Sequence, residues 1–240
     1  LTSAMVDTTR STPTGTPGTG ELLQILRDGR ARTKAELAAH TGLARSTVSS
    51  RVDVLLAAGL VQPAGEAAST GGRPPARMAF NPRAGIVLAI DLGATRATIA
   101  VADLAGHILS SHSRALDIAD GPEAVLDEVL REGAQLMAHG GLEASTLLGV
   151  GIGVPGPVEH STGRPTNPPI MPGWDRFDVP GAVQRTFAVP VLVDNDVNIL
   201  ALGEHALSWP RVDDLIFVKV ATGIGAGITV NLNNAATLAA

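Results

Sequence analysis

The sequence predicts a mixed fold of α+β and α/β type in two consecutive domains, and three observations indicate it. In the first part of the chain, apolar residues recur at helical spacing over three short segments. In the second part, apolar runs of strand length alternate with helical segments. A stretch rich in Gly and Pro, from Gly65 to Pro82, lies between the two patterns. We therefore expect a small domain over residues 20–82 and a larger one over residues 83–240.

Composition narrows the class of protein. Residues 1–19 consist largely of Ser, Thr, Pro and Gly, which predicts a disordered leader. The chain has no Cys, so it can form neither a disulfide nor a thiolate metal site within its 240 residues. No apolar run is long enough to span a bilayer, and no signal-peptide pattern opens the chain. We expect a cytoplasmic protein with no membrane partner and no metal-binding residues.

Charge is distributed unevenly along the chain, which carries a net charge of −5. Residues 1–83 contain 10 Lys and Arg against 6 Asp and Glu, whereas the remaining residues contain 8 against 17. A basic first part followed by an acidic remainder indicates that only the first part meets a polyanion. A difference of this size also arises by chance, so the motifs must show whether the first part of the chain binds a polyanion.

Three helices are predicted in the first domain. The segment Glu21–Asp28 carries apolar residues at helical spacing. Thr33, followed three residues later by Glu36, is a capping-box pattern, and it begins a second helix over residues 34–39. After a turn that contains Gly, a third helix is predicted over Leu43–Ala57. Two short helices, a tight turn and a third helix are typical of a helix-turn-helix.

The third helix carries short hydroxyl and Arg side chains near its start. The side chains expected to meet DNA are Arg45, Ser46, Thr47, Ser49 and Arg51. In the major groove, short side chains permit close approach, and Arg reaches phosphates or guanine edges. Predicted strands over residues 60–62 and 77–80 flank a wing, and we expect Arg73 at its tip to enter the minor groove. The alternative is a three-helix core with an ordinary solvated Arg face.

The second domain is predicted to begin with three strands and to continue with alternating helices and strands. The predicted strands cover residues 85–90, 97–103, 107–113, 147–154, 191–193 and 215–220, and the predicted helices cover residues 121–139 and 197–207. Three antiparallel strands, then a helix and parallel strands, are typical of the ribonuclease-H-like half of the actin and sugar-kinase fold. The predicted fold is thus a winged helix-turn-helix followed by a partial actin-like domain.

Three motifs of the second domain place carboxylates or bare backbone at strand ends. They are Asp91-Leu92-Gly93-Ala94-Thr95, the segment Gly151–Pro157, and Asp194-Asn195-Asp196. Ligands bind at the carboxyl ends of strands in α/β sheets. A carboxylate there can bind a sugar hydroxyl or, in an enzyme, accept its proton. The simpler alternative for the third motif is a helix N-cap, which is compatible with ligand binding.

With these motifs and the helix-turn-helix pattern, the chain resembles the winged-helix transcriptional regulators of the ROK family (repressors, open reading frames and kinases) over roughly residues 20–230. The resemblance implies sugar contacts by Asn167, Asn195 and Asp196, and Asp196 would act as a base only in a kinase. It implies a vestigial nucleotide-phosphate site made of Asp91, Gly93, Thr95, Thr222 and Gly223. No cofactor is required, with Mg²⁺ and ATP implied only for a kinase. A homo-oligomer, such as a dimer, is expected for the full-length protein.

The sequence departs from the family pattern in three places. Ala94 stands where the kinases usually have Gly, and a Cβ there crowds an approaching phosphate. Ala221 and Ala226 likewise stand in the second phosphate loop. The family continues with a Gly-rich turn, a sugar-contacting His and Glu pair, a Cys-rich zinc site and an adenine pocket, none of which residues 231–240 match. We therefore expect a chain truncated at its C-terminus, without the family zinc site.

We predict a sequence-specific DNA-binding transcriptional regulator of carbohydrate metabolism, most simply a repressor. Its partners would be operator DNA and a sugar or sugar phosphate. The alternative is an ATP-dependent sugar kinase, against which the phosphate-loop alanines count. A third possibility is a fragment that binds DNA but senses nothing.

Overall fold

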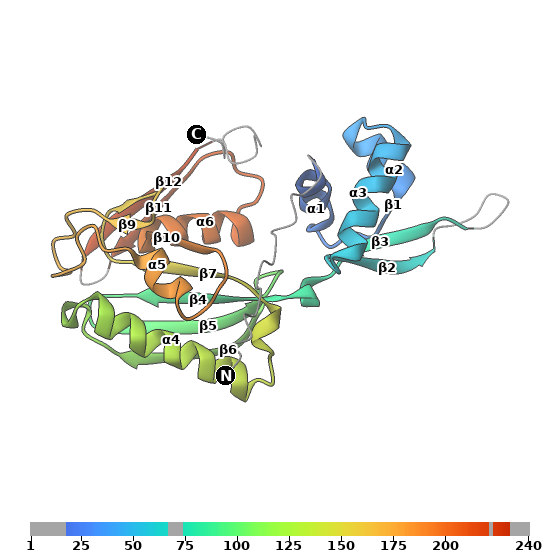
Figure 1. Cartoon of the computed structure of the whole chain (residues 1–240). Helices are drawn as coiled ribbons and strands as arrows, with labels where there is room; N and C mark the ends of the chain where they lie inside the picture. The colour runs from blue at the N-terminus through green and yellow to red at the C-terminus, as the bar shows by residue number, and fades with distance from the viewer. Residues whose placement is uncertain (1–17, 67–73, 221–222, 231–240) are drawn as a thin grey trace, which may run out of the picture. The chain divides into compact units, whose positions relative to one another are not determined.

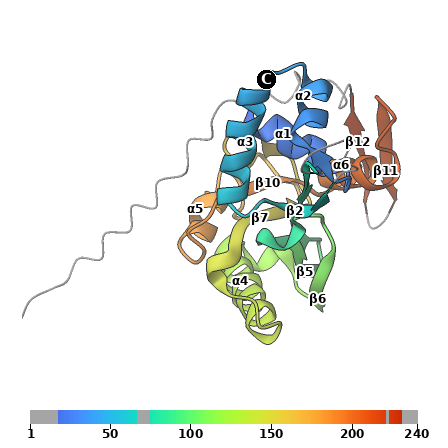
Figure 2. The ribbon, with the colours of Figure 1, turned by 90° about the vertical axis from the view of Figure 1, so that its right-hand side faces the viewer.

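The computed structural model describes residues 18–66, 74–220 and 223–230 (Figures 1 and 2). The chain divides into two compact units, the first ending at Ala84 and the second beginning at Gly85. The predicted boundary between residues 82 and 83 falls inside η1 (Pro82–Ala84), a short 3-10 helix that ends the first unit. The predicted leader lies outside the described residues except at its end, where the first helix already begins at Thr19.

The first unit combines three helices with a small sheet. Its elements are α1 (Thr19–Leu26), β1 (Arg32–Thr33), α2 (Lys34–Thr41), α3 (Arg45–Ala57), β2 (Val61–Glu66) and β3 (Ala76–Phe80). The strands pair antiparallel in the order β1-β3-β2. The predicted winged helix-turn-helix is confirmed, and β1 adds a short strand that the sequence did not predict. Residues 67–73, which include Arg73, lie outside the described residues.

Apolar side chains from all three helices and both longer strands fill the core of this unit. They are Leu22, Leu26, Leu37, Val48, Val52, Leu55, Val61 and Met78. The predicted capping box is present: Oγ1 of Thr33 accepts the Glu36 N–H at 3.1 Å, and the Glu36 carboxylate accepts the Thr33 N–H at 2.7 Å. These hydrogen bonds to Thr33 lower the pKa of the Glu36 carboxyl. The capping box therefore fixes the residue at which α2 begins.

The second unit is built on a five-stranded sheet in the order β10-β7-β4-β5-β6. The strands are β4 (Ile86–Leu92), β5 (Arg96–Asp103), β6 (Ile108–Ala115), β7 (Leu147–Val154) and β10 (Val191–Asn195). The pairs β4–β5 and β5–β6 are antiparallel, whereas β7 runs parallel to both β4 and β10. This topology confirms the predicted ribonuclease-H-like arrangement (Figure 1).

Helices cover both faces of the sheet. They are α4 (Pro122–His139), α5 (Val179–Gln184) and α6 (Asp196–Ser208). On β7, Val150, Ile152 and Val154 alternate into the core that α4 and α5 complete. Gly153, between Ile152 and Val154, approaches α6, since a Cβ there would lie 3.4 Å from the Ile199 side chain. Glycine at this position of β7 thus lets α6 pack close to the sheet.

A two-stranded hairpin, β11 (Leu215–Val220) and β12 (Ile224–Thr229), packs on α6. The prediction that Ala226 stands in a phosphate loop is wrong, because Ala226 belongs to β12 together with Gly225 and Gly227. A Cβ at Gly227 would lie 2.6 Å from the carbonyl oxygen of Val197, so glycine is required for this close approach. Ala226 pairs with Val218 in the hairpin and has a strand role, not a loop role.

The remaining elements are short. They are β8 (Val158–Glu159), β9 (Arg164–Pro165), η2 (Ile118–Asp120) and η3 (Ala144–Thr146), and neither the β8–β9 pair nor α5 was predicted. Trp174 is fully buried, and its indole N–H donates to the carbonyl oxygen of Ile118 at 3.0 Å, which holds the loop after β9 onto η2. Across the described residues, no helix is both long enough and apolar enough to cross a membrane.

Candidate functional site

The start of α3 is the first candidate site. Arg45 and Ser46 are exposed, and Thr47 and Ser49 are half-buried. The N-cap residue Ala44 forms no side-chain hydrogen bond to the helix. The first turn of α3 thus has no side-chain cap from its N-cap residue, and N–H groups at such a helix start can donate to a phosphate oxygen.

Ser49 is part of a small network that the sequence analysis missed. The ammonium of Lys34 donates to Oγ of Ser49 at 2.8 Å and to the carboxylate of Asp53 at 2.8 Å. Ser49 and Asp53 lie one turn apart on α3, and Lys34 begins α2. Lys34 thus adds a cation beside the candidate face of α3. The basic balance of the first 83 residues was the only sequence signal for it.

Arg51 does not lie on this face, and the prediction that it contacts DNA does not fit its placement. Its guanidinium packs beside Gly18, lies 4.0 Å from the Glu21 carboxylate, and has a side chain that is only 15% exposed. The reason is helical geometry: at about 100° per residue, six residues after Arg45 turns the side chain away toward α1. In the described part of the chain, its Nε and Nη1 atoms have no hydrogen-bond partner.

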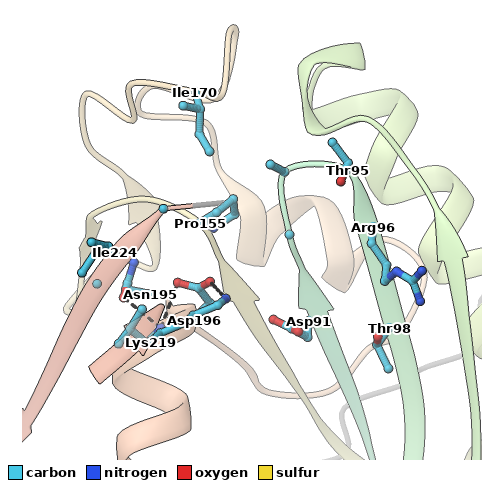
Figure 3. A pocket seen from close by; sticks show the side chains of 15 residues that line it. Asp91, Thr95, Arg96, Thr98, Pro155, Ile170, Asn195, Asp196, Lys219 and Ile224 are labelled. Atoms are coloured by element: carbon cyan, nitrogen blue, oxygen red, sulfur yellow. Dashed lines mark hydrogen bonds and ion pairs between the residues drawn. The ribbon is translucent and has the colours of Figure 1, made fainter. Parts of the chain in front are cut away.

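The second candidate site is a cleft of about 530 Å³ in the second unit (Figure 3). Its lining includes Asp91, Gly93, Ala94, Thr95, Arg96, Thr98, Pro155, Ile170, Asn195, Asp196, Val197, Lys219, Gly223, Ile224 and Gly225. The carboxyl ends of three parallel strands meet here, since Asp91 is paired in register with Gly153 and Gly153 with Asp194. Two of the predicted motifs, separated by a hundred residues, are thereby brought to one edge of the sheet.

The side chain of Asp91 lines this cleft, as Figure 3 shows. The surrounding chain reduces its hydration, and this desolvation raises the pKa of the Asp91 carboxyl. The positive charge of Lys219 opposes the rise, and the negative charge of Asp196 adds to it. Lys219 and Asp196 are thus close enough to Asp91 for the three charges to act on one another.

Asn195 and Asp196 form the start of α6, as the N-cap alternative requires. Oδ1 of Asn195 accepts the Val197 N–H at 3.0 Å, and its amide donates to the Gly156 carbonyl oxygen at 3.1 Å. Oδ1 of Asp196 accepts the same Val197 N–H at 2.9 Å. Both side chains nevertheless line the cleft, so a capping role and a ligand-facing position coexist.

Lys219, on β11, lines the cleft and was not among the predicted site residues. Its ammonium donates to Oδ2 of Asp196 at 2.6 Å (Figure 3). The Asp196 side chain is only 7% exposed, whereas that of Lys219 is 31% exposed. Lys219 interrupts the apolar strand Leu215–Val220, and that lone charge was the available signal.

Asn167 does not join Asn195 and Asp196 in lining the cleft, so the predicted group of three sugar contacts is not assembled. Its backbone is left-handed, with φ of 44°, and its N–H donates to the Asp175 carboxylate at 2.8 Å. Asn tolerates this conformation, which gives the residue a role in the turn. The same loop presents Ile170 to the cleft instead.

The predicted phosphate site is partly described. Gly93, Thr95 and Gly223 line the cleft, while Thr222 lies outside the described residues. The N–H of Gly93 donates to the Arg96 carbonyl oxygen at 2.8 Å, so the turn's own hairpin occupies this donor. Across residues 18–66, 74–220 and 223–230, no three His, Asp or Glu side chains converge as metal ligands.

The fold and the cleft define a class of protein: a winged helix-turn-helix joined to a sugar-kinase-like domain. The sequence model of the ROK family matches residues 87–236, and that of the MarR family matches residues 22–73. The chain belongs to the ROK family.

Four of the relatives that match 87–88% of this chain are xylose repressors by name, one of them a putative one. The xylose repressor of Bacillus subtilis (strain 168) is 32% identical over 211 residues, which cover 88% of this chain and 54% of that protein. The xylose repressor of Caldicellulosiruptor bescii is 29% identical, with coverage of 88% and 53%. This chain thus spans about half the length of the curated relatives it matches.

Solved structures likewise match either most of the chain or only about three fifths of it. A ROK family transcriptional regulator, described as a homolog of the E. coli MLC protein, aligns with a TM-score of 0.76 at 21% identity, and the match covers 89% of this chain and 54% of that one. A ROK hexokinase from Thermus thermophilus aligns with a TM-score of 0.52 at 26% identity, and that match covers 61% of this chain and 47% of that one.

Proposed function

We propose that this protein is a DNA-binding transcriptional repressor whose second unit binds a sugar. One observation carries the proposal: the matches to the xylose repressors extend over 88% of the chain, whereas the match to the hexokinase extends over 61%. Similarity to the repressors therefore includes the winged helix-turn-helix, which a sugar kinase does not need. Xylose is the first sugar to test, because it stands in the names of these relatives.

The DNA contact would centre on the start of α3. Arg45 and Ser46 are exposed there, and Lys34 lies beside Ser49 on the same side of the helix-turn-helix. Arg45 would reach a base edge or a phosphate, and Lys34 would leave Asp53 to meet a phosphate. A wing contact by Arg73 remains a prediction.

The experiment is selection of a duplex from a randomised DNA library with the full chain, followed by fluorescence anisotropy on that duplex. Arg45→Ala should weaken binding by about 1–3 kcal/mol, which is roughly 5- to 150-fold in affinity. Arg131→Ala is the matched control, because Arg131 is exposed on α4 in the other unit. Affinity should fall steeply as salt is raised, since neutralised phosphates release counterions. Failure to enrich any duplex at low salt would contradict DNA binding.

A sugar response requires a second measurement on the same complex. Xylose, added to the chain bound to its selected duplex, should lower or raise DNA affinity, whereas L-arabinose serves as a comparison sugar. Linkage then requires DNA to change xylose affinity by the same factor, which calorimetry with and without the duplex can check. A complex indifferent to xylose, glucose, xylose 5-phosphate and glucose 6-phosphate would contradict the sensing half of the proposal.

The second candidate is an ATP-dependent sugar kinase, which the family match and the position of Asp196 in the cleft favour. Against it stands the extent of the similarity, since the relatives named glucokinase match only 60–61% of this chain, whereas the xylose repressors match 88%. We therefore expect no sugar-dependent ADP release with Mg²⁺, ATP and a panel of hexoses and pentoses. Release that Asp196→Ala abolishes would revive the kinase function.

A further inference from the structure

Lys219 stands between the open cleft and Asp196. Its side chain lines the cleft and is 31% exposed, whereas the carboxylate it covers belongs to a side chain that is 7% exposed. Figure 3 shows the hydrogen bond between the two side chains as a dashed line. A ligand that approaches Asp196 therefore meets the Lys219 ammonium first.

The ammonium has donors to spare. A lysine carries three N–H groups, and one of them is used at 2.6 Å by Oδ2 of Asp196. Across the described residues no second acceptor contacts Lys219, which leaves two N–H groups for oxygen atoms in the cleft. An ionised carboxylate has about four acceptor positions, and the two hydrogen bonds to Asp196 leave about two of them. The pair therefore offers donors and acceptors side by side.

This combination matches two neighbouring hydroxyl groups. One hydroxyl can donate its hydrogen to Asp196, while the oxygen of the next accepts from the ammonium. Lys219 is held in place for this task, because Asp196 is fixed as the first residue of α6 and its Oδ1 caps the helix. The aliphatic stem of Lys219 lies on the half-buried face of β11 together with Leu215 and Phe217. The ion pair with Asp196 thus restrains the ammonium, and the half-buried position on β11 restrains the stem of the side chain.

We infer that Lys219 is a sugar-binding residue, and that the Lys219–Asp196 pair recognises two adjacent hydroxyl groups of an uncharged sugar. The inference rests on the proposed sugar-sensing function and names a residue and a ligand pattern for it. It implies that Lys219 determines which hydroxyl the site requires. A hydrogen bond to a charged donor of this kind contributes about tenfold or more in affinity.

The test is isothermal calorimetry of the full chain with xylose, with glucose and with the four glucose analogues that lack one hydroxyl at position 2, 3, 4 or 6. Lys219→Met should weaken binding about tenfold or more, and Lys219→Arg, which keeps a charged donor, should recover most of the loss. Val218→Met is the matched control, because Val218 is 55% exposed on the opposite face of β11. It should leave affinity unchanged.

The deoxy sugars separate a contact from a structural effect. The wild type should discriminate against at least one analogue, and Lys219→Met should bind that analogue as well as it binds glucose, whatever its absolute affinity. Should Lys219→Met fold poorly, the same analogue series on Lys219→Arg must show altered discrimination at that hydroxyl. Unchanged affinity and discrimination in Lys219→Met, while Asp196→Ala binds more weakly, would overturn the inference and leave sugar sensing intact. Absence of binding by the wild type to every sugar would overturn both.

Discussion

Replacing Gly227 with Ala should loosen the β11–β12 hairpin from α6. The added Cβ would lie 2.6 Å from the Val197 carbonyl oxygen and 2.8 Å from Cβ of Ala201, so the backbone of β12 or of α6 must move. Forcing one methyl into a packed contact costs about 1–3 kcal/mol, and the relief of glycine's backbone entropy returns at most about 1 kcal/mol. We expect a net destabilisation of about 1–2 kcal/mol.

The measurement is thermal and urea unfolding, with Gly203→Ala as the matched control. Gly203 lies in the middle of α6, and nothing stands within 4 Å of the position a Cβ would take. In a helix interior this change should stabilise by about 0.5–1 kcal/mol. For a unit of this size, 1 kcal/mol corresponds to roughly 2–4 °C in Tm, so the two variants should move Tm in opposite directions. Equal stability of the two variants would refute the close approach of β12 to α6.

Three further changes test other parts of the structure by urea unfolding. Thr33→Ala removes half of the capping box and should destabilise the first unit by about 1 kcal/mol; no change would contradict the cap at α2. Trp174→Phe removes the indole donor of the buried Ile118 carbonyl, which keeps only the longer hydrogen bond from the Gly121 N–H at 3.4 Å, and should cost about 1–3 kcal/mol; unchanged stability would contradict a contribution from the indole hydrogen bond. The hydrogen bonds from Arg32 lower the pKa of Asp28 to about 2, below the ordinary 3.8. The ionised Asp28 carboxylate therefore stabilises the fold fully above about pH 4, and this contribution is lost as the pH falls through 2 and the carboxylate is protonated. Because the Asp28 side chain is 41% exposed, screening reduces it to about 1 kcal/mol; the gap between wild type and Asp28→Asn should close by pH 2.

The sequence predicted the elements whose periodicity is strong and local. The helices α3 and α4 and the strand β7 fall at or within two residues of the predicted bounds, because each buries a regular apolar face. The capping box at Thr33 was predictable because all of its atoms come from four consecutive residues. Prediction failed for β12, where Gly225 and Gly227 look like loop residues. Their glycine identity comes from contact with α6, which local pattern does not reveal.

The sequence predicted the carboxylates of the cleft, Asp91 and Asp196, but not Lys219 beside them. The placement of Arg51 in the first unit was predicted wrongly for the same reason. Asp91 and Asp196 stand at strand ends, where topology alone brings them together. Whether a charged side chain faces solvent, a neighbour or a ligand depends on tertiary packing, which spacing cannot give. Arg51 was expected on the DNA side but packs beside α1, and Lys219, which carried no expectation, covers Asp196. A buried carboxylate held by a more exposed ammonium differs from the free carboxylate that a general base requires, and this difference favours a binding site over a catalytic one.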